Sequence, residues 1–189
     1  MSAPGAGADA LAAVAATLQA EGGLVAEAVA PPPPGTVTPH GDAAAAGPRA
    51  ARDPAAYVEI VEAVREGHLT HVADGVGGGS RIVTTTDADL ALLVGDRLYA
   101  LGLSRLADRG DLEAVAALAD TIVLGAQAQA TGDADLADAA WEAGAQAVGH
   151  GPSEALEAAK NQARAGDPSA SSALRAAARQ LGRLGTQAP

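Results

Sequence analysis

The feature of this sequence that most constrains the fold is a long apolar segment in the middle of the chain, residues 87–108. Leucines and valines recur along it at helical spacing and cover two faces of a helix. They are Leu90, Leu93, Val94, Leu98 and Leu101 on one face, and Leu92, Tyr99, Leu103 and Leu106 on the other. A helix that is apolar on most sides is buried by its neighbours. We therefore expect a buried helix enclosed by other helices.

The rest of the chain is poor in large apolar side chains. Hydrophobic residues make up 48% of its 189 residues, but Phe is absent and there are only one Trp and two Tyr. A buried large side chain contributes about 1.5–3 kcal/mol, and alanine contributes far less. Leu and Val must therefore form the core on helices that approach closely through Ala and Gly. Such a small core also favours a partner protein that completes it.

Short turns rich in Gly and Asp separate the remaining helical patterns. Candidate N-caps precede them at Asp53, Asp87, Asp111, Asp133, Ser153 and Asp167. An Asp at this position accepts a backbone N–H and suits the helix dipole. Helices joined by short turns pack antiparallel, so the sequence predicts an all-α antiparallel bundle of about six helices over residues 54–186.

The N-terminal region differs in composition from this bundle. Residues 1–29 carry a helical pattern that Gly22 and Gly23 interrupt, which predicts a marginal helix. Residues 30–53 hold Pro31–Pro34, further Pro and Gly, and almost no large apolar side chain. Such a segment buries too little surface to offset the entropy of ordering. We expect a flexible, disordered Pro/Ala/Gly-rich linker there.

The charge and composition limit the classes of partner. The net charge of −11 argues against binding to nucleic acid or to an anionic membrane, since both require basic patches. The absence of Cys excludes disulfides, thiolate catalysis and Cys-based zinc sites. No apolar run approaches the roughly 20 residues of a membrane span, and no secretory signal is evident. We expect a cytoplasmic protein.

One candidate metal site has the spacing H-x-x-H-x-x-D, formed by His68, His71 and Asp74. Residues three apart on a helix share a face, so two imidazoles could chelate a metal there with Asp74 one turn further on. The alternative is a pair of polar residues at a fraying helix end. Both interpretations stay open at this stage.

Acidic residues near helix starts offer a second candidate. Asp133, Asp135 and Asp138, with Asp87 and Asp89, could hold Mg²⁺, which is usually bound by one or two carboxylates and substrate phosphates. Helix capping explains the same residues more simply, and we favour it. Asp96, in the middle of the apolar segment, is interpreted as a structural polar anchor. If it is buried, it needs a cation or several donors, which Arg105 or a residue of another helix could supply.

The segment from Leu90 to Ala107 resembles the Gly-Asp helix of the trans-isoprenyl (polyprenyl) diphosphate synthase superfamily. It is most similar to the small, non-catalytic subunit of two-component heptaprenyl diphosphate synthases. The shared features span about residues 56–130 and occur in the family's order at Gly95-Asp96, Tyr99, Leu106-Ala107, Gly110-Asp111 and Ala119-Asp120. The resemblance implies an all-α fold and an interface role for Gly95, Asp96 and Tyr99.

The departures from this family concern its chemistry. Active members carry Asp-rich DDxxD motifs that hold Mg²⁺ on the allylic diphosphate, and this chain has no two adjacent Asp residues. No catalytic residue is therefore carried over. The resemblance implies no cofactor of the chain's own, and Mg²⁺ only together with a catalytic partner.

The sequence and the resemblance together lead to one main hypothesis. The chain is an accessory, non-catalytic subunit that supports isoprenoid (quinone side-chain) biosynthesis through a helical interface with a catalytic polyprenyl synthase subunit. One alternative is a small metal-dependent helical enzyme that uses His68, His71 and Asp74. Another is a homo-oligomeric helical interaction module, in which the chain associates with itself.

Overall fold

The computed structural model describes residues 6–72 and 79–185, and over these ranges the protein is an all-α bundle, as the sequence predicts. The elements are α1 (Ala6–Glu21), α2 (Gly23–Glu27), α3 (Pro39–Ala45), the 3₁₀ helix η1 (Pro48–Ala50), α4 (Pro54–Val72), α5 (Ala88–Asp108), α6 (Leu112–Thr131), α7 (Ala134–His150), α8 (Glu154–Arg164) and α9 (Ala170–Gly185). Six α-helices, α4 to α9, follow the N-terminal region.

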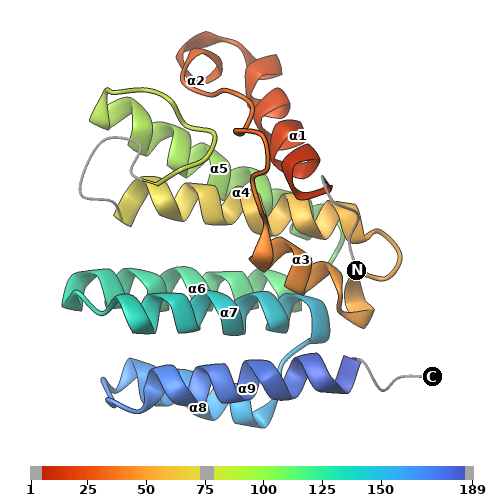
Figure 1. The fold of residues 1–189 in the computed structure, drawn as a ribbon, viewed down its shortest axis with the longest axis vertical. Helices are drawn as coiled ribbons and strands as arrows, with labels where there is room; N and C mark the ends of the chain where they lie inside the picture. Colours follow the sequence, from red (N-terminus) through yellow and green to blue (C-terminus); the bar gives the residue numbers. More distant parts are fainter. Residues whose placement is uncertain (1–5, 73–78, 186–189) are drawn as a thin grey trace.

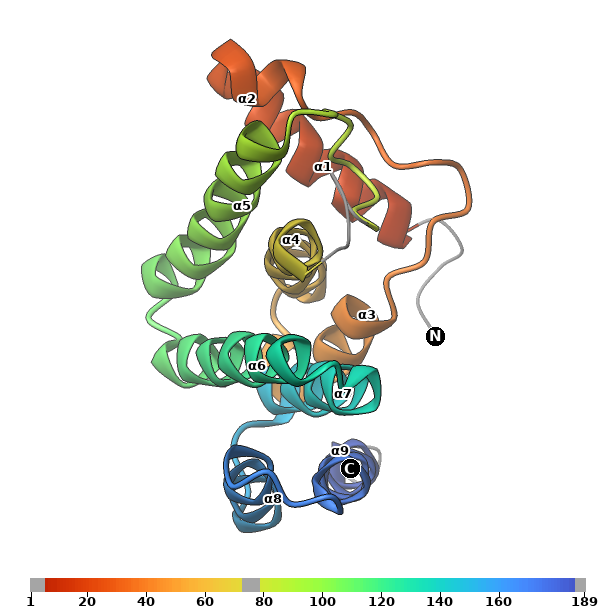
Figure 2. The same ribbon diagram turned by 90° about the vertical axis from the view of Figure 1, so that its left-hand side faces the viewer.

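The helices are arranged in three tiers (Figure 1). α1, α2, α4 and α5 form the upper tier, α6 and α7 the middle one, and α8 and α9 the lower one. α3 contacts both α4 and α7 and so joins the upper and middle tiers. Figure 2 shows α4 end-on, with α1, α3, α5 and α6 around it. The central helix of the upper tier is therefore α4.

This arrangement corrects the expectation that residues 87–108 are buried on most sides. α5 buries the face that carries Val94, Leu98 and Leu101, but Leu92 and Leu93 on its outer face are exposed. The physical reason is that α4 covers only one side of α5. The apolar pattern of α5 is wider than the surface that the described part of the chain covers.

The contact between α4 and α5 is close because glycines line it. A Cβ at Gly95 would overlap Thr70 Oγ1 and lie 2.6 Å from His71 Cε1. A Cβ at Gly102 would lie 2.9 Å from the backbone oxygen of Ile60. Only glycine fits at such separations, so these two positions set the distance between the helices, as the composition predicts.

The predicted disordered linker over residues 30–53 is a second point on which the structure differs. Its second half forms α3 and η1, in which Ala44 and Ala50 are fully buried. A Cβ at Gly47 would lie 2.5 Å from Gly149 Cα, so the backbone of this segment lies directly against the end of α7. Small residues order this segment through backbone approach instead of through large side chains.

The N-terminal helix packs on the bundle. Leu11, Val14 and Leu18 of α1 are fully buried, with Val94 and Leu98 of α5 in the same apolar cluster. α1 ends at Glu21, before the predicted interruption at Gly22 and Gly23, which both have positive φ.

The segment before α5 buries Ile82 and Val83 and pairs with another part of the chain. Val83 forms an isolated antiparallel bridge with Val29. Thr84 N donates to Ala28 O at 2.8 Å and Ala30 N donates to Ile82 O at 2.9 Å. The bridge ties the N-terminal region to the start of α5.

The predicted N-caps are confirmed at five helices. Asp53 accepts a hydrogen bond from Ala56 N, Asp87 from Leu90 N, Asp111 from Ala114 N, Asp133 from Leu136 N and Ser153 from Leu156 N, at distances of 2.9–3.3 Å. Asp167 accepts from Ser169 N instead, and α9 begins at Ala170. None of the helices in the described ranges is long and apolar enough to cross a membrane.

Candidate functional site

The residues predicted for the metal site and for the family-like helix meet at one place. His68 and His71 lie on α4, and Gly95, Asp96 and Tyr99 lie on the facing part of α5. Gly95 makes the approach possible, because a side chain there would collide with His71. The two predicted sets are thus parts of one contact.

His71 anchors Asp96 across this contact. Its Nε2 lies 3.0 Å from Asp96 Oδ1, its Nδ1 lies 2.7 Å from Gly67 O, and its ring centre is 5.1 Å from that of Tyr99. The Asp96 side chain is 72% exposed, so no buried charge needs compensation. A residue of another helix provides the partner, one of the two predicted options, since Arg105 pairs with Glu59 instead.

His68 is buried deeper in the same contact. Its ring centre lies 5.2 Å from that of the fully buried Trp141, and its Nδ1 lies 3.4 Å from Tyr99 Oη. A Cβ at Gly125 of α6 would come within 2.6 Å of the ring. Burial, reinforced by the charge of Arg65, lowers the pKa of His68 to about 4. The ring is therefore neutral at pH 7 and acts as part of the core.

Trp141 is the centre of a cluster that the sequence did not reveal. His40 of α3 contacts it edge-on at 5.8 Å, and the Cζ atom of Arg65 lies 4.8 Å from its ring centre. Burial lowers the pKa of His40 to about 4 and also lowers the pKa of Arg65. The cation over the indole ring is a stabilising cation–π contact, and it fixes α4 against α7.

The predicted metal site is not assembled from the described residues. His68 contacts Trp141 and Tyr99, whereas His71 contacts Asp96. Asp74 lies outside the described residues. Within residues 6–72 and 79–185, no group of three or more His, Asp or Glu side chains could hold a metal ion. A site that depends on Asp74 stays a prediction.

A second polar cluster in the interior was missed by sequence analysis. Glu62 and Glu66, one turn apart on α4, are both fully buried, and Arg81 lies between them. Arg81 donates to Glu62 Oε2 through Nη2 and to Glu66 Oε1 through Nε, each at 2.5 Å. Burial raises the pKa of Glu62 despite this guanidinium. The spacing of two Glu residues on an apolar helix face was the only signal in the sequence.

The other oxygens of these carboxylates are also occupied. Gly41 N donates to Glu62 Oε1 at 2.7 Å, and Ser80 Oγ and Arg81 N donate to Glu66 Oε2. All four carboxylate oxygens accept hydrogen bonds from the protein itself. The cluster therefore fastens α3 and the segment before α5 to α4, and it offers no unoccupied acid or base for chemistry.

The acidic helix starts serve as caps, in agreement with the favoured interpretation. Asp87 and Asp133 accept backbone N–H groups, and Asp135 pairs with Arg175 at 2.8 Å. Their carboxylates neutralise helix termini and a neighbouring cation.

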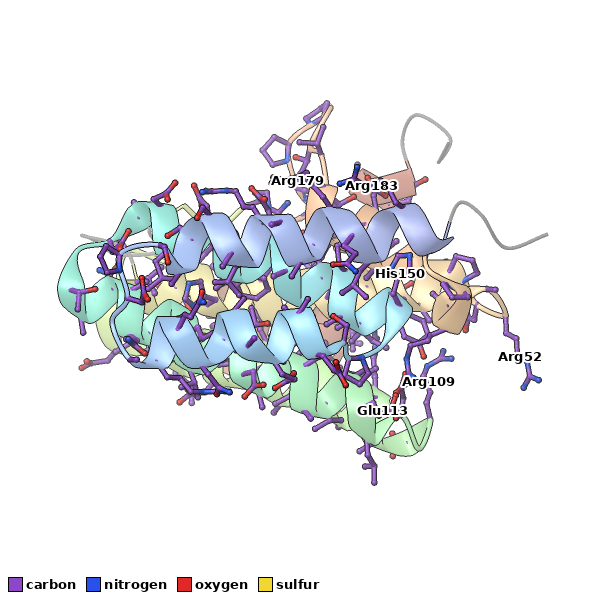
Figure 3. All side chains as sticks on the ribbon, turned by 90° about the horizontal axis from the view of Figure 1, so that it is seen from below. Arg52, Arg109, Glu113, His150, Arg179 and Arg183 are labelled. Carbon is purple, nitrogen blue, oxygen red and sulfur yellow. The ribbon has the colours of Figure 1, made fainter. Side chains whose placement is uncertain are left out.

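Arg52, Arg109 and Glu113 lie at one end of the molecule (Figure 3). An open cavity of about 410 Å³ there is lined by Arg49, Arg52, Asp53, Tyr57, Arg109, Gly110 and Asp111. Arg49 pairs with Asp111 and Glu113, and Arg109 pairs with Asp53. Tyr57 Oη donates to Asp111 Oδ2 at 2.6 Å. The ion pairs of Arg49 therefore join η1 to the start of α6, and the hydrogen bond of Tyr57 joins α4 to the same point.

The outer face of α6 has a different character. We call it the α6 seam, and it consists of Leu112, Ala116, Ala119, Val123, Ala126 and Ala130. All six residues are exposed, and Leu112 and Val123 are 69% and 57% accessible. Their spacing of four, three, four, three and four residues follows the a and d positions of a heptad. The seam has the pattern of a helix that packs against another helix.

The edges of the seam continue this pattern. Val115 and Ile122 flank it on one side and are half-buried. On the other side Asp120 accepts from Lys160 at 2.9 Å and from Arg164 at 2.7 Å, and Glu113 pairs with Arg49. The seam is thus an uncharged strip between an apolar edge and an edge of compensated charges.

Comparisons with known proteins leave this geometry as the main guide to function. No family model matches the chain, and neither the curated proteins nor the solved structures include a match. The α6 seam and the filled contact between α4 and α5 are therefore the structural features that bear on function.

Proposed function

We propose that this protein is a non-catalytic helical interaction subunit, which works by binding a helical partner along the α6 seam. The observation that carries the proposal is the seam itself. Surface helices of globular proteins normally place polar and charged residues on their outer face. Here six outward positions at heptad spacing, from Leu112 to Ala130, are apolar.

The length of the seam fits a helix–helix interface. Its 19 residues from Leu112 to Ala130 span roughly 27 Å, at a rise of about 1.5 Å per residue. Four of its six residues are Ala, which lets a partner helix approach toward the short end of the usual 8–10 Å interaxial range. A contiguous apolar strip of this kind is typical of a protein-binding surface.

The interior of the protein supports a binding role over a catalytic one. His68 is enclosed by Trp141 and Tyr99, and the carboxylates of Glu62 and Glu66 are held by Arg81 and backbone N–H groups. All four oxygens of the two carboxylates accept hydrogen bonds within the protein. Polar clusters with every member satisfied specify a rigid core.

In one form of this proposal, the partner is a catalytic polyprenyl synthase subunit, as the resemblance to polyprenyl diphosphate synthases implies. Gly95, Asp96 and Tyr99 of the family-like helix pack on α4, which leaves Leu92 and Leu93 exposed on the outer face of α5. A catalytic polyprenyl synthase subunit that binds α5 and α6 would make this chain an accessory subunit of isoprenoid, quinone side-chain synthesis.

The experiment that tests the proposal combines the seam with a matched control. Val123→Glu places a charge in the seam, and Val37→Glu makes the same change at a valine that is 73% exposed elsewhere. Co-purification with the catalytic polyprenyl synthase subunit of the same organism, product chain length, and self-association are measured for all three chains. We expect Val123→Glu alone to abolish association. Equal behaviour of the two variants in every assay would contradict the proposal.

A further inference from the structure

The α6 seam matches a second copy of itself, and we infer that the protein forms a homodimer in which two α6 helices pack antiparallel along their seams. This inference rests on the proposed function and names the partner. A two-fold dimer requires a self-complementary surface, in which residue i contacts residue j and residue j contacts residue i. The order of large and small residues along the seam meets this requirement.

In an antiparallel pair of α6 helices, the two-fold axis passes next to residue 121 of each copy, and the seam residues of the two copies pair around it. Leu112 then faces Ala130 of the second copy, Ala116 faces Ala126, and Ala119 faces Val123. Each of the two large residues is opposite an alanine, and no level brings two large side chains together. Each level also pairs a d position with an a position, which is the layer geometry of antiparallel helix pairs. A parallel pair would place Leu112 on Leu112 and Val123 on Val123.

The charged edge of the seam, with Glu113 and Asp120, is also compatible with an antiparallel pair. An antiparallel pair brings the Asp120 edges of the two copies together, and these carboxylates would repel if they were uncompensated. Each Asp120 is already held by Lys160 and Arg164 of its own chain. Glu113 faces the region of Gln127 and is held by Arg49. A chain with a net charge of −11 can therefore meet itself here without an unpaired like charge at the contact.

The apolar edge adds contact area on the other side of the pair. Ile122, near the two-fold axis, faces Ile122 of the second copy, and Val115 faces the region of Gln129. Both side chains are half-buried in the isolated chain and would be covered on dimer formation. The interface would thus contain a close alanine-rich centre with a larger apolar side chain at its edge.

Cysteine trapping tests both the dimer and its direction, because the natural chain contains no Cys. Chains with Ala116→Cys and with Ala126→Cys are oxidised separately and as a mixture, each at a concentration where the natural chain sediments at twice its 18.3 kDa mass. In an antiparallel pair, residue 116 faces residue 126, whereas two copies of residue 116 are separated by about 15 Å along the axis. A disulfide needs Cα atoms within roughly 7 Å. We expect a crosslink only in the mixture.

A matched control uses Ser172→Cys, an exposed position on α9, mixed with Ala116→Cys, and this pair should stay uncrosslinked. Crosslinks of each seam variant with itself would mean a parallel pair and would overturn the inference. A second result would also overturn the inference: the natural chain is monomeric, and Val123→Glu abolishes its binding to the catalytic subunit. The proposed function would stand in that case. A monomer in which Val123→Glu changes no association would contradict both.

Discussion

Two helices of this protein each carry a row of small residues. The row on α5 is covered by α4, whereas the row on the outer face of α6 is exposed. Gly95 and Gly102 lie against α4, so closely that a Cβ at Gly102 would come within 2.9 Å of a backbone oxygen. Ala116, Ala119 and Ala126 on α6 lie in the open. The same property, a helix surface without long side chains, is satisfied by a neighbour in one region and left uncovered in the other.

The difference indicates what the uncovered row is for. In the filled contact, small residues allow a second helix to approach, and the two helices then bury Val94, Leu98 and Val64 around them. The α6 seam offers the same approach, with Leu112 and Val123 ready to be buried. We therefore interpret the seam as one half of a helix pair whose other half comes from a second molecule.

The largest loss of folding stability is expected from removing Arg81 from the cluster that it forms with Glu62 and Glu66. Arg81→Met removes the cation that pairs with two fully buried carboxylates, and breaking a buried ion pair costs about 3–5 kcal/mol. The matched change Arg164→Met, at a partly exposed pair beside the seam, should cost less than about 1 kcal/mol. Urea unfolding of both variants measures this difference, and equal losses would refute a special role for the buried cluster.

The second largest effect should be a fall in the free energy of unfolding at acidic pH, because His68 is buried in the neutral form. The pKa of His68 is about 4 in the folded protein because of burial, against 6.5 in the unfolded chain. The unfolded state therefore binds the proton first, and the stabilisation present above pH 6.5 is lost as the pH falls toward 4. This amounts to about 2–3 kcal/mol for His68. His40 acts in the same direction.

The free energy of unfolding, measured from pH 7 to pH 4.5, checks this expectation. His68→Gln should lose part of the slope while keeping the contribution of His40. An unchanged slope in the variant would show that His68 is accessible to protons in the folded state.

A smaller effect is expected from adding one side chain to each row. Gly102→Val inserts atoms where α4 and α5 touch, and overpacking of this kind costs about 1–3 kcal/mol. Ala119→Val adds a similar group to the exposed seam, and the stability of the monomer should change by less than about 0.5 kcal/mol. Thermal unfolding at low protein concentration compares the two, and a large loss for Ala119→Val would mean that the seam is not free.

The smallest change in monomer stability should accompany a clear change in association. Ala119→Val places valine opposite Val123 of the second copy, so the dimer dissociation constant should rise at least tenfold. The double variant Ala119→Val/Val123→Ala exchanges the large and small residues and restores each pair. Sedimentation should therefore show recovery of the dimer in the double variant, and its failure to recover would argue against large–small matching.

Local features of the fold were predicted well because they depend on neighbours in sequence. The N-caps at Asp87, Asp111 and Asp133 follow from short side chains that reach backbone N–H groups three residues ahead. The end of α1 before Gly22 follows from the backbone freedom of glycine. These causes act within one turn of helix, so the sequence displays them directly.

The site residues could be predicted only in part, because their roles depend on distant partners. His71 and Asp96 were identified, but their pairing requires α4 and α5 to lie side by side. Glu62 was missed because nothing near it in sequence indicates that Arg81 would fold over it. The same reason explains the linker, since the burial of Ala44 depends on the end of α7.

The residue pattern was enough to predict that the chain is helical, where α4 to α8 begin, and that small residues make close contacts in its core. The heptad spacing of the α6 seam is also present in the sequence. The arrangement in space was needed to show that α4, rather than α5, is the central helix of the upper tier, and that this seam faces outward. The physical reason is that periodicity defines the faces of a helix, whereas the neighbours in space determine which of those faces is covered.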